Sequence, residues 1–305
     1  MANLYVFHQG YQGGFRPDSG QLLWSYYDGA NWSADAQIQN LGMTGSPSAV
    51  PWLGGIAVFH QGYAASGQLW YTYSSDGQQW GGDTPWGQPN FPVQDLGMSE
   101  SPSAIVYNGL LYVFHQGYGD NGQLWYTYYD GATWSADTPI PGVGMSGSPS
   151  AVLWQGGICV LHQGQNDNGQ LWYTYSPDGT HWGGDTPWGY PFPVQNLGMS
   201  ESPSAVVYNG LLYVFHQGYA DNEQLWYTYY DGANWSPDTP LTPGVLMTGS
   251  PSAVLWQGGI SVFSQGQNEN ATLWYTYSPD GKQWGGDTPW GGGGLLTESP
   301  SCVVF

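Results

Sequence analysis

A sequence unit of about fifty residues occurs six times in this chain of 305 residues, and it limits the possible folds more than any other feature. Each copy has a Ser-Pro-Ser triplet, an apolar run, a glycine turn, a segment ending in Gln-Gly and a segment containing Leu and Trp. The triplets begin at Ser46, Ser101, Ser148, Ser202, Ser250 and Ser299. So short a unit cannot bury its apolar faces alone, and its repetition predicts a ring or stack of units.

Each unit is predicted to form four antiparallel strands. In the second copy we expect strands at Ala104–Tyr107, Leu111–His115 and Gln123–Tyr129, with a short fourth strand around Trp134. Asn108-Gly109 is a strong hairpin signal between the first two strands. No window has helical periodicity, and 48 Gly and 22 Pro interrupt every segment. The pattern is typical of an all-β fold, a six-bladed β-propeller of four-stranded blades.

The two ends of the chain complete one unit between them. Residues 299–305 form a first strand with no successor, and the N-terminus starts at a second strand with no predecessor. Pairing them would close the ring without an open edge. We therefore predict one propeller domain, 1–305, with blades starting near residues 46, 101, 148, 202 and 250, and with 299 onward joined to 1–45.

A longer period of two units overlies the first. Residues 100–139 match 201–240 at 35 of 40 positions. A Gly-Gly-Asp-Thr-Pro-Trp insertion occurs in alternate copies. The residue before Ser-Pro-Ser also alternates, between Glu (Glu100, Glu201, Glu298) and Gly (Gly45, Gly147, Gly249). These alternations predict a ring with pseudo-threefold symmetry.

The charge of the chain excludes several classes of partner. It has two Lys plus Arg against 22 Asp plus Glu, a net charge of −20. With almost no cations to neutralise phosphates, binding to nucleic acid or to an anionic membrane is not expected. No apolar stretch is long enough to insert in a membrane as a helix. A neutral, hydroxyl-rich ligand fits this balance better. The N-terminus begins directly with a predicted strand, so no signal peptide is expected and the location would be cytoplasmic or reached by another export route.

The turn between the second and third strands is the first candidate site. Pairing would bring a His-Gln pair next to an aromatic plate from the following strand, a combination that suits a sugar ring and its hydroxyls. The candidate sugar-binding residues are His8, Gln9, Trp24, His60, Gln61, Trp70, His115, Gln116, Trp125, His162, Gln163, Trp172, His216, Gln217, Trp226, Gln265 and Trp274. Ser264 replaces His in the sixth copy, which we expect to bind differently.

A structural interpretation of the same residues stays open. His and Gln could be buried struts that bond backbone groups between blades, and the tryptophans could pack blade against blade. The aspartates that follow the fourth-strand tryptophans, such as Asp83, are expected to cap turns. Secondary ligand candidates are Glu100, Glu201 and Glu298, which could ring the channel, and three loop tryptophans expected to be exposed, Trp86, Trp188 and Trp290.

Metal and catalytic sites find little support. Five histidines at blade spacing cannot share one zinc ion. The loops Asp120-Asn121, Asn166-Asp167-Asn168 and Asp221-Asn222 lack the carboxylate spacing of a dedicated calcium loop, so weak calcium binding is the most they suggest. No cofactor is expected. Glycoside hydrolysis needs two carboxyl groups with different roles, and three equivalent glutamates do not provide a distinct acid and base.

Two resemblances to known families follow from these residues. Ser75-Asp-Gly-Gln-Gln-Trp80 resembles the Asp-box of sialidase-type propellers, but those enzymes bind a carboxylate with several arginines, and this chain has only Arg16.

Six near-equivalent blades with aromatic and polar residues at their mouths resemble the β-propeller lectins of fungi and bacteria. That resemblance implies a non-enzymatic, multivalent glycan-binding lectin of unspecified oligomeric state. The fucose-binding members use Arg, Glu and Trp, and the missing Arg leaves the sugar unassigned. A propeller glycoside hydrolase or lyase and a protein-interaction scaffold are the alternatives.

Overall fold

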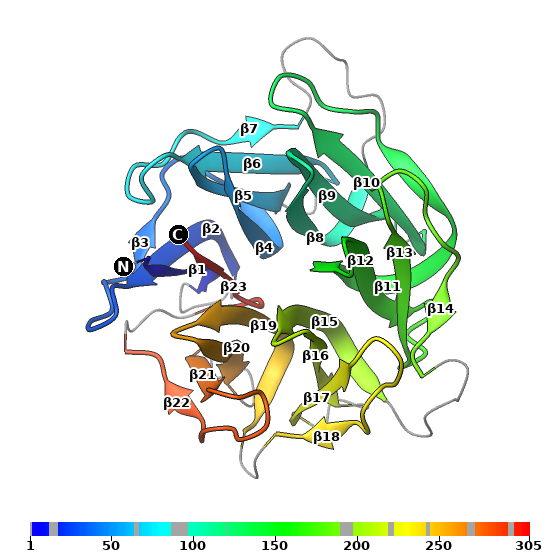
Figure 1. The fold of residues 1–305 in the computed structure, drawn as a ribbon. Helices are drawn as coiled ribbons and strands as arrows, with labels where there is room; N and C mark the ends of the chain where they lie inside the picture. The colour runs from blue at the N-terminus through cyan, green and yellow to red at the C-terminus, as the bar shows by residue number, and fades with distance from the viewer. Residues whose placement is uncertain are drawn as a thin grey trace.

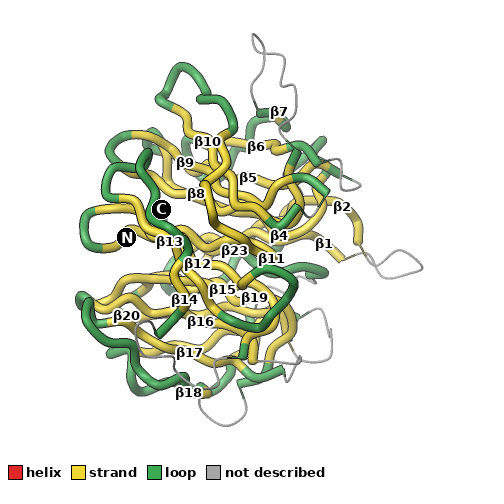
Figure 2. Tube along the Cα trace, turned by 90° about the vertical axis from the view of Figure 1, so that its right-hand side faces the viewer, coloured by secondary structure: helices red, strands yellow, loops and turns green. Residues whose placement is uncertain are grey.

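The structure is a computed structural model that describes residues 2–11, 18–63, 67–86, 97–119, 121–189, 198–218, 223–241, 245–266, 272–291 and 296–305. Its described residues form β-strands, turns and irregular segments, and Figure 2 shows no helix among them. Accordingly, no helix long and apolar enough to cross a membrane occurs in these ranges. The expectation of an all-β fold is confirmed.

Six antiparallel blades stand around a central axis (Figure 1). Blade 1 contains β23 (Ser301–Val304), β1 (Leu4–Tyr11), β2 (Asp18–Tyr27) and β3 (Ala36–Gln37). Blade 2 contains β4 (Met43–Trp52), β5 (Gly55–Gly62), β6 (Leu69–Ser74) and β7 (Thr84–Pro85). Blade 3 contains β8 (Met98–Tyr107), β9 (Leu110–Gly117), β10 (Gln123–Tyr129) and the start of β11 (Thr138–Trp154).

The remaining blades repeat the pattern. Blade 4 contains the rest of β11, β12 (Gly157–Gly164), β13 (Leu171–Ser176) and β14 (Thr186–Pro187). Blade 5 contains β15 (Met199–Tyr208), β16 (Leu211–Gly218), β17 (Leu225–Tyr230) and β18 (Thr239–Pro240). Blade 6 contains β19 (Met247–Trp256), β20 (Gly259–Gly266), β21 (Leu273–Ser278) and β22 (Thr288–Pro289). Because β11 passes from blade 3 into blade 4, these two blades share one seven-stranded sheet.

The ring closes as predicted. β23 pairs with β1, with Leu4 opposite Val304 and Phe7 opposite Ser301. The termini therefore lie side by side in blade 1 (Figure 1). The fourth strands differ from the prediction. Thr138, not Trp134, begins the fourth strand of blade 3 and pairs with Tyr126, while Trp134 makes an isolated bridge to Tyr129.

The Ser-Pro-Ser triplets lie on the innermost strands and tie neighbouring blades together. The first serine hydroxyl of one triplet accepts a hydrogen bond from the backbone of the preceding blade, as in Ser46 N to Ser101 Oγ at 2.8 Å. The second serine accepts one from the following blade, as in Ala104 N to Ser48 Oγ at 2.9 Å. The second type of bond connects every pair of neighbouring blades. The triplet is thus an interblade connector.

The hydrophobic core is divided into six clusters, each between two neighbouring blades. Two kinds of interface alternate. Between blades 2 and 3, 4 and 5, and 6 and 1, a tryptophan ends the inner strand: Trp52, Trp154 and Trp256. We call these three interfaces the tryptophan seams. At the other three interfaces Tyr107, Tyr208 or Phe305 follows or ends the inner strand. The alternation agrees with the predicted pseudo-threefold symmetry.

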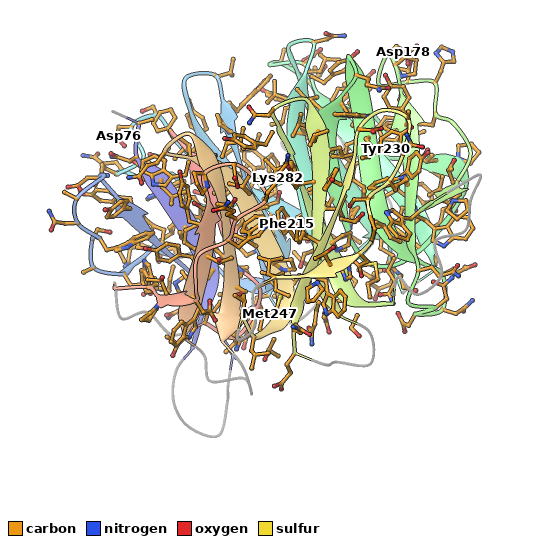
Figure 3. All side chains as sticks on the ribbon, turned by 60° about the horizontal axis from the view of Figure 1, so that its bottom comes forward. Asp76, Asp178, Phe215, Tyr230, Met247 and Lys282 are labelled. Carbon is orange, nitrogen blue, oxygen red and sulfur yellow. The ribbon has the colours of Figure 1, made fainter. Side chains whose placement is uncertain are left out.

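Each blade exposes its turns on two opposite faces of the ring. Antiparallel order places the first-to-second and third-to-fourth turns on one face and the second-to-third loops on the other. Figure 3 shows Asp76 and Asp178, from third-to-fourth turns, near one rim, with Met247, the first residue of β19, toward the other. We call the first the Asp-Gly face and the second the His-Gln face.

Candidate functional site

The histidines of the His-Gln turns are buried. His60, His115, His162 and His216 have no exposed surface and His8 has 1%. His60 Nε2 lies 3.0 Å from Asp83 Oδ1, and His60 Nδ1 lies 3.0 Å from the carbonyl oxygen of Gln61. The same two contacts occur in the other four blades with a histidine. Each ring nitrogen thus lies within hydrogen-bonding distance of a protein oxygen, and the tautomer of the imidazole decides which of the two oxygens accepts its N–H.

The aspartates therefore have a different partner from the one predicted. Asp83 and its counterparts Asp35, Asp137, Asp185 and Asp238 contact a histidine of the same blade. Each pair ties the second strand to the segment that precedes the fourth strand. Because these imidazoles are enclosed and have a protein oxygen beside each nitrogen, none of the five is exposed for contact with a ligand. The geometry favours the strut interpretation.

The glutamines of the same turns are also buried, between 1% and 6% exposed. Gln61 Nε2 donates to the carbonyl oxygen of Met98 in the next blade, at 3.1 Å. Gln265 Nε2 donates to the carbonyl oxygen of Leu296, at 3.3 Å. In three other blades the Oε1 atom is buried without a partner, in Gln9, Gln116 and Gln217. These two hydrogen bonds support a role for the glutamines in joining one blade to the next.

The third-strand tryptophans do not occupy one equivalent position. Trp125 pairs with His115, as expected, and Trp70, Trp172, Trp226 and Trp274 have the same register. Trp24 pairs with Phe7 instead, and Leu23 stands opposite His8. Trp24 therefore faces the other side of its sheet and is buried, so the expected equivalence of Trp24 with Trp125 is wrong. The shift is visible in the sequence, where Leu22-Leu23-Trp24 replaces Leu-Trp-Tyr.

The three loop tryptophans expected to be exposed are buried. Trp86, Trp188 and Trp290 are 8%, 6% and 5% exposed. Each packs against a tryptophan of the next blade: Trp86 on Trp134, Trp188 on Trp235 and Trp290 on Trp32, with ring centroids 5.7 to 6.0 Å apart. The exposure prediction failed because the insertion folds back into the tryptophan seam. Trp32, Trp134 and Trp235 thus pack between blades, which agrees with the structural interpretation of these tryptophans.

The three glutamates line a pocket at the channel mouth, as predicted. Glu100, Glu201 and Glu298 surround a cavity of about 440 Å³ together with serines of the six triplets. Glu100 and Glu201 have left-handed backbone angles, φ 61° and 62°, and glycines stand at the alternating positions. Residues of the described ranges form no group of three or more His, Cys, Asp or Glu that could hold a metal ion. Asp120, Asp221 and Asn222 of the suggested calcium loops lie outside the described residues.

An aromatic cleft opens in the tryptophan seam between blades 6 and 1. It has a volume of about 440 Å³ and is lined by Tyr27, Trp32, Trp256, Phe263, Tyr275 and Tyr277, among other residues. Tyr27, Trp32, Trp256, Tyr275 and Tyr277 are half-buried, so part of each ring faces solvent. Gln257 and the hydroxyl-bearing Ser261 also line the cleft. Aromatic faces beside amide and hydroxyl groups form a surface that can stack on a sugar ring and bond its hydroxyls.

The rings of this cleft are held in place by their neighbours. Tyr27 lies 5.1 Å from Trp32 and 6.2 Å from Trp256 between ring centroids. Tyr277 Oη donates to the carbonyl oxygen of Gln257, at 3.1 Å. A surface fixed in this way loses little conformational entropy on binding.

The other two tryptophan seams have the same framework. Trp52 lies 6.4 Å from Tyr129, and Trp154 lies 6.1 Å from Tyr230. Tyr73 donates to the carbonyl of Leu53, and Tyr175 to that of Gln155. The residues at the positions of Gln257, Ser261 and Phe263 vary among the seams: they are Leu53, Ala57 and Phe59 in one seam and Gln155, Cys159 and Leu161 in the other. The three seams thus share a Trp–Tyr ring pair and a tyrosine hydroxyl bond, and they differ in polarity.

Sequence reasoning missed these seams. It followed the six-fold His-Gln motif, whereas the cleft residues repeat with the two-blade period. The available signal was the alternation of Trp52, Trp154 and Trp256, spaced 102 residues apart, with Tyr107 and Tyr208 at intervening strand ends.

Blade 6 lacks the histidine strut. Ser264 stands at the histidine position opposite Trp274. The counterpart aspartate, Asp287, has a buried Oδ1 atom without a hydrogen-bond partner. Burial raises the pKa of Asp287 to about 6, although a hydrogen bond from the backbone of Leu246 lowers it in part. Asp287 Oδ1 thus lacks the histidine partner that the other five aspartates have.

The chain matches no family model and no curated protein. Solved structures do match over nearly the whole chain. An Aleuria aurantia lectin mutant in complex with Fucα1-6GlcNAc has a TM-score of 0.66 and 15% identity, covering 97% of this chain and 92% of that one. A mutant of AofleA from Arthrobotrys oligospora, with three arginines changed to alanine, has a TM-score of 0.65 and 11% identity, covering 94% and 83%.

An enzyme structure is also similar. An α-L-arabinofuranosidase from Clostridium thermocellum has a TM-score of 0.55 and 12% identity, covering 83% of this chain and 95% of that one. At these identities the similarity shows the fold. Because a further similar structure of Aleuria aurantia lectin is described as a six-bladed β-propeller, the six-bladed architecture predicted from the repeats is confirmed.

Proposed function

We propose that this protein is a multivalent lectin that binds neutral sugars in its three tryptophan seams. The observation that carries the proposal is the aromatic cleft between blades 6 and 1, whose ring framework recurs in two further seams. Sugar rings stack their C–H faces on aromatic side chains while neighbouring amides and hydroxyls bond their hydroxyl groups.

The charge of the protein supports a neutral ligand. The residues that line the cleft include no Lys or Arg. The whole chain has only Arg16 and Lys282, so a carboxylate or sulfate would find little compensation. The similar lectin structures contain fucose-based ligands, and this supports sugar binding as the class of function. The AofleA structure carries changes at three arginines. This chain has only one arginine, Arg16. Sugar recognition in this protein would therefore depend on aromatic side chains and on groups that hydrogen-bond to hydroxyls.

Several sites on one ring would bind multivalent glycans much more tightly than single sugars. Simultaneous occupation of linked sites raises the overall affinity by a factor of about 100 to 10,000 where the geometry permits. The seams with more polar side chains should have the higher affinity for sugars. We expect the seam with Gln257 and Ser261 to bind better than the seam with Leu53 and Ala57.

Isothermal titration with a saccharide selected on a glycan array tests the proposal. Trp52→Ala, Trp154→Ala and Trp256→Ala should each remove one of three sites, and the triple variant should not bind. Tyr118→Ala is the matched control, because Tyr118 is an exposed aromatic residue at the opposite, His-Gln face. Full binding by a folded triple variant would overturn the seam assignment, and failure of the wild type to bind any glycan would overturn the function.

A glycoside hydrolase is the second candidate, favoured by the ring of glutamates at the channel mouth and by the similarity to an arabinofuranosidase. Such enzymes use two carboxyl groups with separate roles. Release of reducing sugar from a polysaccharide panel, abolished by Glu100→Gln, Glu201→Gln or Glu298→Gln, would support this candidate over the lectin. A protein-interaction scaffold would instead retain partners that competing sugars do not displace.

A further inference from the structure

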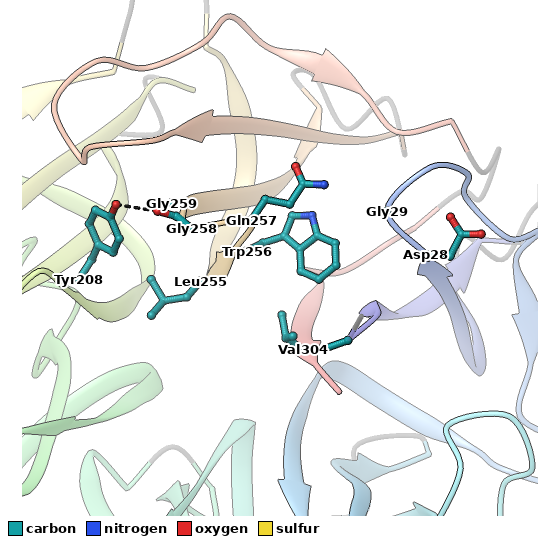
Figure 4. A pocket seen from close by; sticks show the side chains of 10 residues that line it. Asp28, Gly29, Tyr208, Leu255, Trp256, Gln257, Gly258, Gly259 and Val304 are labelled. Atoms are coloured by element: carbon teal, nitrogen blue, oxygen red, sulfur yellow. Dashed lines mark hydrogen bonds between the residues drawn. The ribbon is translucent and has the colours of Figure 1, made fainter.

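A second cavity adjoins the aromatic cleft on its inner side. It has a volume of about 390 Å³ and lies on the Asp-Gly face between blades 5, 6 and 1. Leu255, Trp256, Val304 and Tyr208 form its walls, with Asp28 and Gln257 at its edge (Figure 4). Trp256 and Gln257 also line the aromatic cleft. The two cavities therefore share one wall and one amide side chain.

We propose that the aromatic cleft and this second cavity together bind a neutral oligosaccharide of at least two sugar units, which passes over Trp256. This inference rests on the proposed lectin function. Each cavity is near the lower limit of roughly 300 to 1,000 Å³ that small-ligand sites usually have. One cavity suits one sugar ring, and their continuity at Trp256 suits two linked rings.

The walls of the second cavity have the chemistry of a sugar subsite. Leu255 is 43% exposed, and the half-buried Trp256 stands beside Val304, so an apolar surface is available for a C–H face. Asp28 supplies a carboxylate, whose Oδ1 accepts hydrogen bonds from the backbone of Asn31 and Ala30. These bonds, from Asn31 first, lower the pKa of Asp28. An ionised carboxylate is a strong acceptor for sugar hydroxyls.

The cavity is formed before a ligand arrives. Tyr208 Oη lies 2.7 Å from the carbonyl oxygens of Gly258 (Figure 4) and of Pro279, which share its one hydroxyl proton, and these contacts fix the wall at blade 5. No atom lies within 4 Å of the position that a Cβ atom would take on Gly29. At the pseudo-equivalent Gly232, the Gln155 side chain is 2.9 Å from that position. The Gln155 side chain therefore covers the glycine turn in the seam of blades 4 and 5, whereas the equivalent space beside Gly29 in the seam of blades 6 and 1 is open.

The experiment uses the variant Trp52→Ala/Trp154→Ala, in which only the seam of blades 6 and 1 retains the tryptophan at the end of its inner strand. Titration calorimetry compares methyl glycosides with matching disaccharides based on fucose, glucose, mannose and N-acetylglucosamine. For at least one pair we expect the disaccharide to bind at least 10-fold more tightly. Adding Ala2→Trp should remove this gain, because Ala2 lines only the second cavity and is exposed. Affinity for the monosaccharide should stay within 2-fold.

The outcomes separate the two proposals. If methyl glycosides bind but no disaccharide gains affinity, the two-unit site is wrong and the lectin function stands. The same holds if the gain survives Ala2→Trp. If no saccharide binds either this variant or the wild type, both proposals are overturned. Leu255→Ala, which removes part of the apolar wall, gives an independent check and should reduce the gain without affecting the methyl glycoside.

Discussion

His115 Nε2 and Asp137 Oδ1 lie 3.0 Å apart in blade 3, with the imidazole fully buried and the carboxylate 10% exposed. The pair joins the second strand to the segment before the fourth strand. Four other blades contain the same pair. The most regular motif of the sequence is therefore a brace inside the blade, and the candidate sugar site lies in the tryptophan seams, where aromatic rings are partly exposed.

His115→Ala should destabilise the fold without removing sugar sites. Loss of one partner leaves a largely buried carboxylate uncompensated, a change that costs about 3 kcal/mol. Urea denaturation measures the loss, and titration of the folded variant should still give wild-type stoichiometry. His181→Ala is the control, since His181 is exposed and pairs with Asp178 at the surface. A His115→Ala protein with wild-type stability and lost binding would show that His115 contacts the ligand.

Asp287→Asn should stabilise the protein at neutral pH. Burial raises the pKa of Asp287 from its usual 3.8 to about 6, so folding favours the protonated form. The associated stability is present below about pH 4 and is lost as the pH rises through 6. Because solvent reaches part of the carboxyl group, we expect a gain of only about 1 kcal/mol at pH 7. Denaturation at pH 4 and pH 7 measures it. Equal effects at both pH values would contradict this explanation.

Ser264→His should complete the sixth brace. The new imidazole would stand opposite Trp274, in the register that pairs His115 with Trp125. A hydrogen bond to the unpartnered Oδ1 of Asp287 should add about 1 kcal/mol at pH 7. The double variant Ser264→His/Asp287→Asn is the control and should lack most of that gain. Destabilisation in both backgrounds would show that blade 6 has no room for the ring.

Ser103→Ala should weaken the contact between blades 3 and 4. Ser103 Oγ accepts a hydrogen bond from the backbone nitrogen of Ala151, at 2.9 Å. Its removal leaves a partly buried N–H group without its partner, which costs about 1 to 2 kcal/mol. The exposed Ser75→Ala provides a reference. Thermal unfolding measures the difference, and equal melting temperatures for the two variants would argue against the connector role of the triplets.

The architecture could be predicted because each signal was repeated six times. Glycine turns, alternating strands and complementary chain ends all indicated one closed ring, and pairing of Leu4 with Val304 agrees with it. The site was harder to predict. Whether Trp86 faces solvent or the next blade depends on how the insertion folds back, which is a tertiary contact that local sequence does not encode. His115 has the right chemistry for a sugar, but only its burial shows that Asp137 and Gln116 engage both nitrogens.

A crystal structure with a bound saccharide tests the central claim most directly. The account predicts density for a sugar ring in the seam of blades 6 and 1, stacked on the aromatic side chains around Trp32 and Trp256. Corresponding density is expected near Trp154 and, at lower occupancy, near Trp52. A sugar found instead on the His-Gln face beside Tyr118, or in the channel beside Glu100, with all three seams empty, would contradict the account.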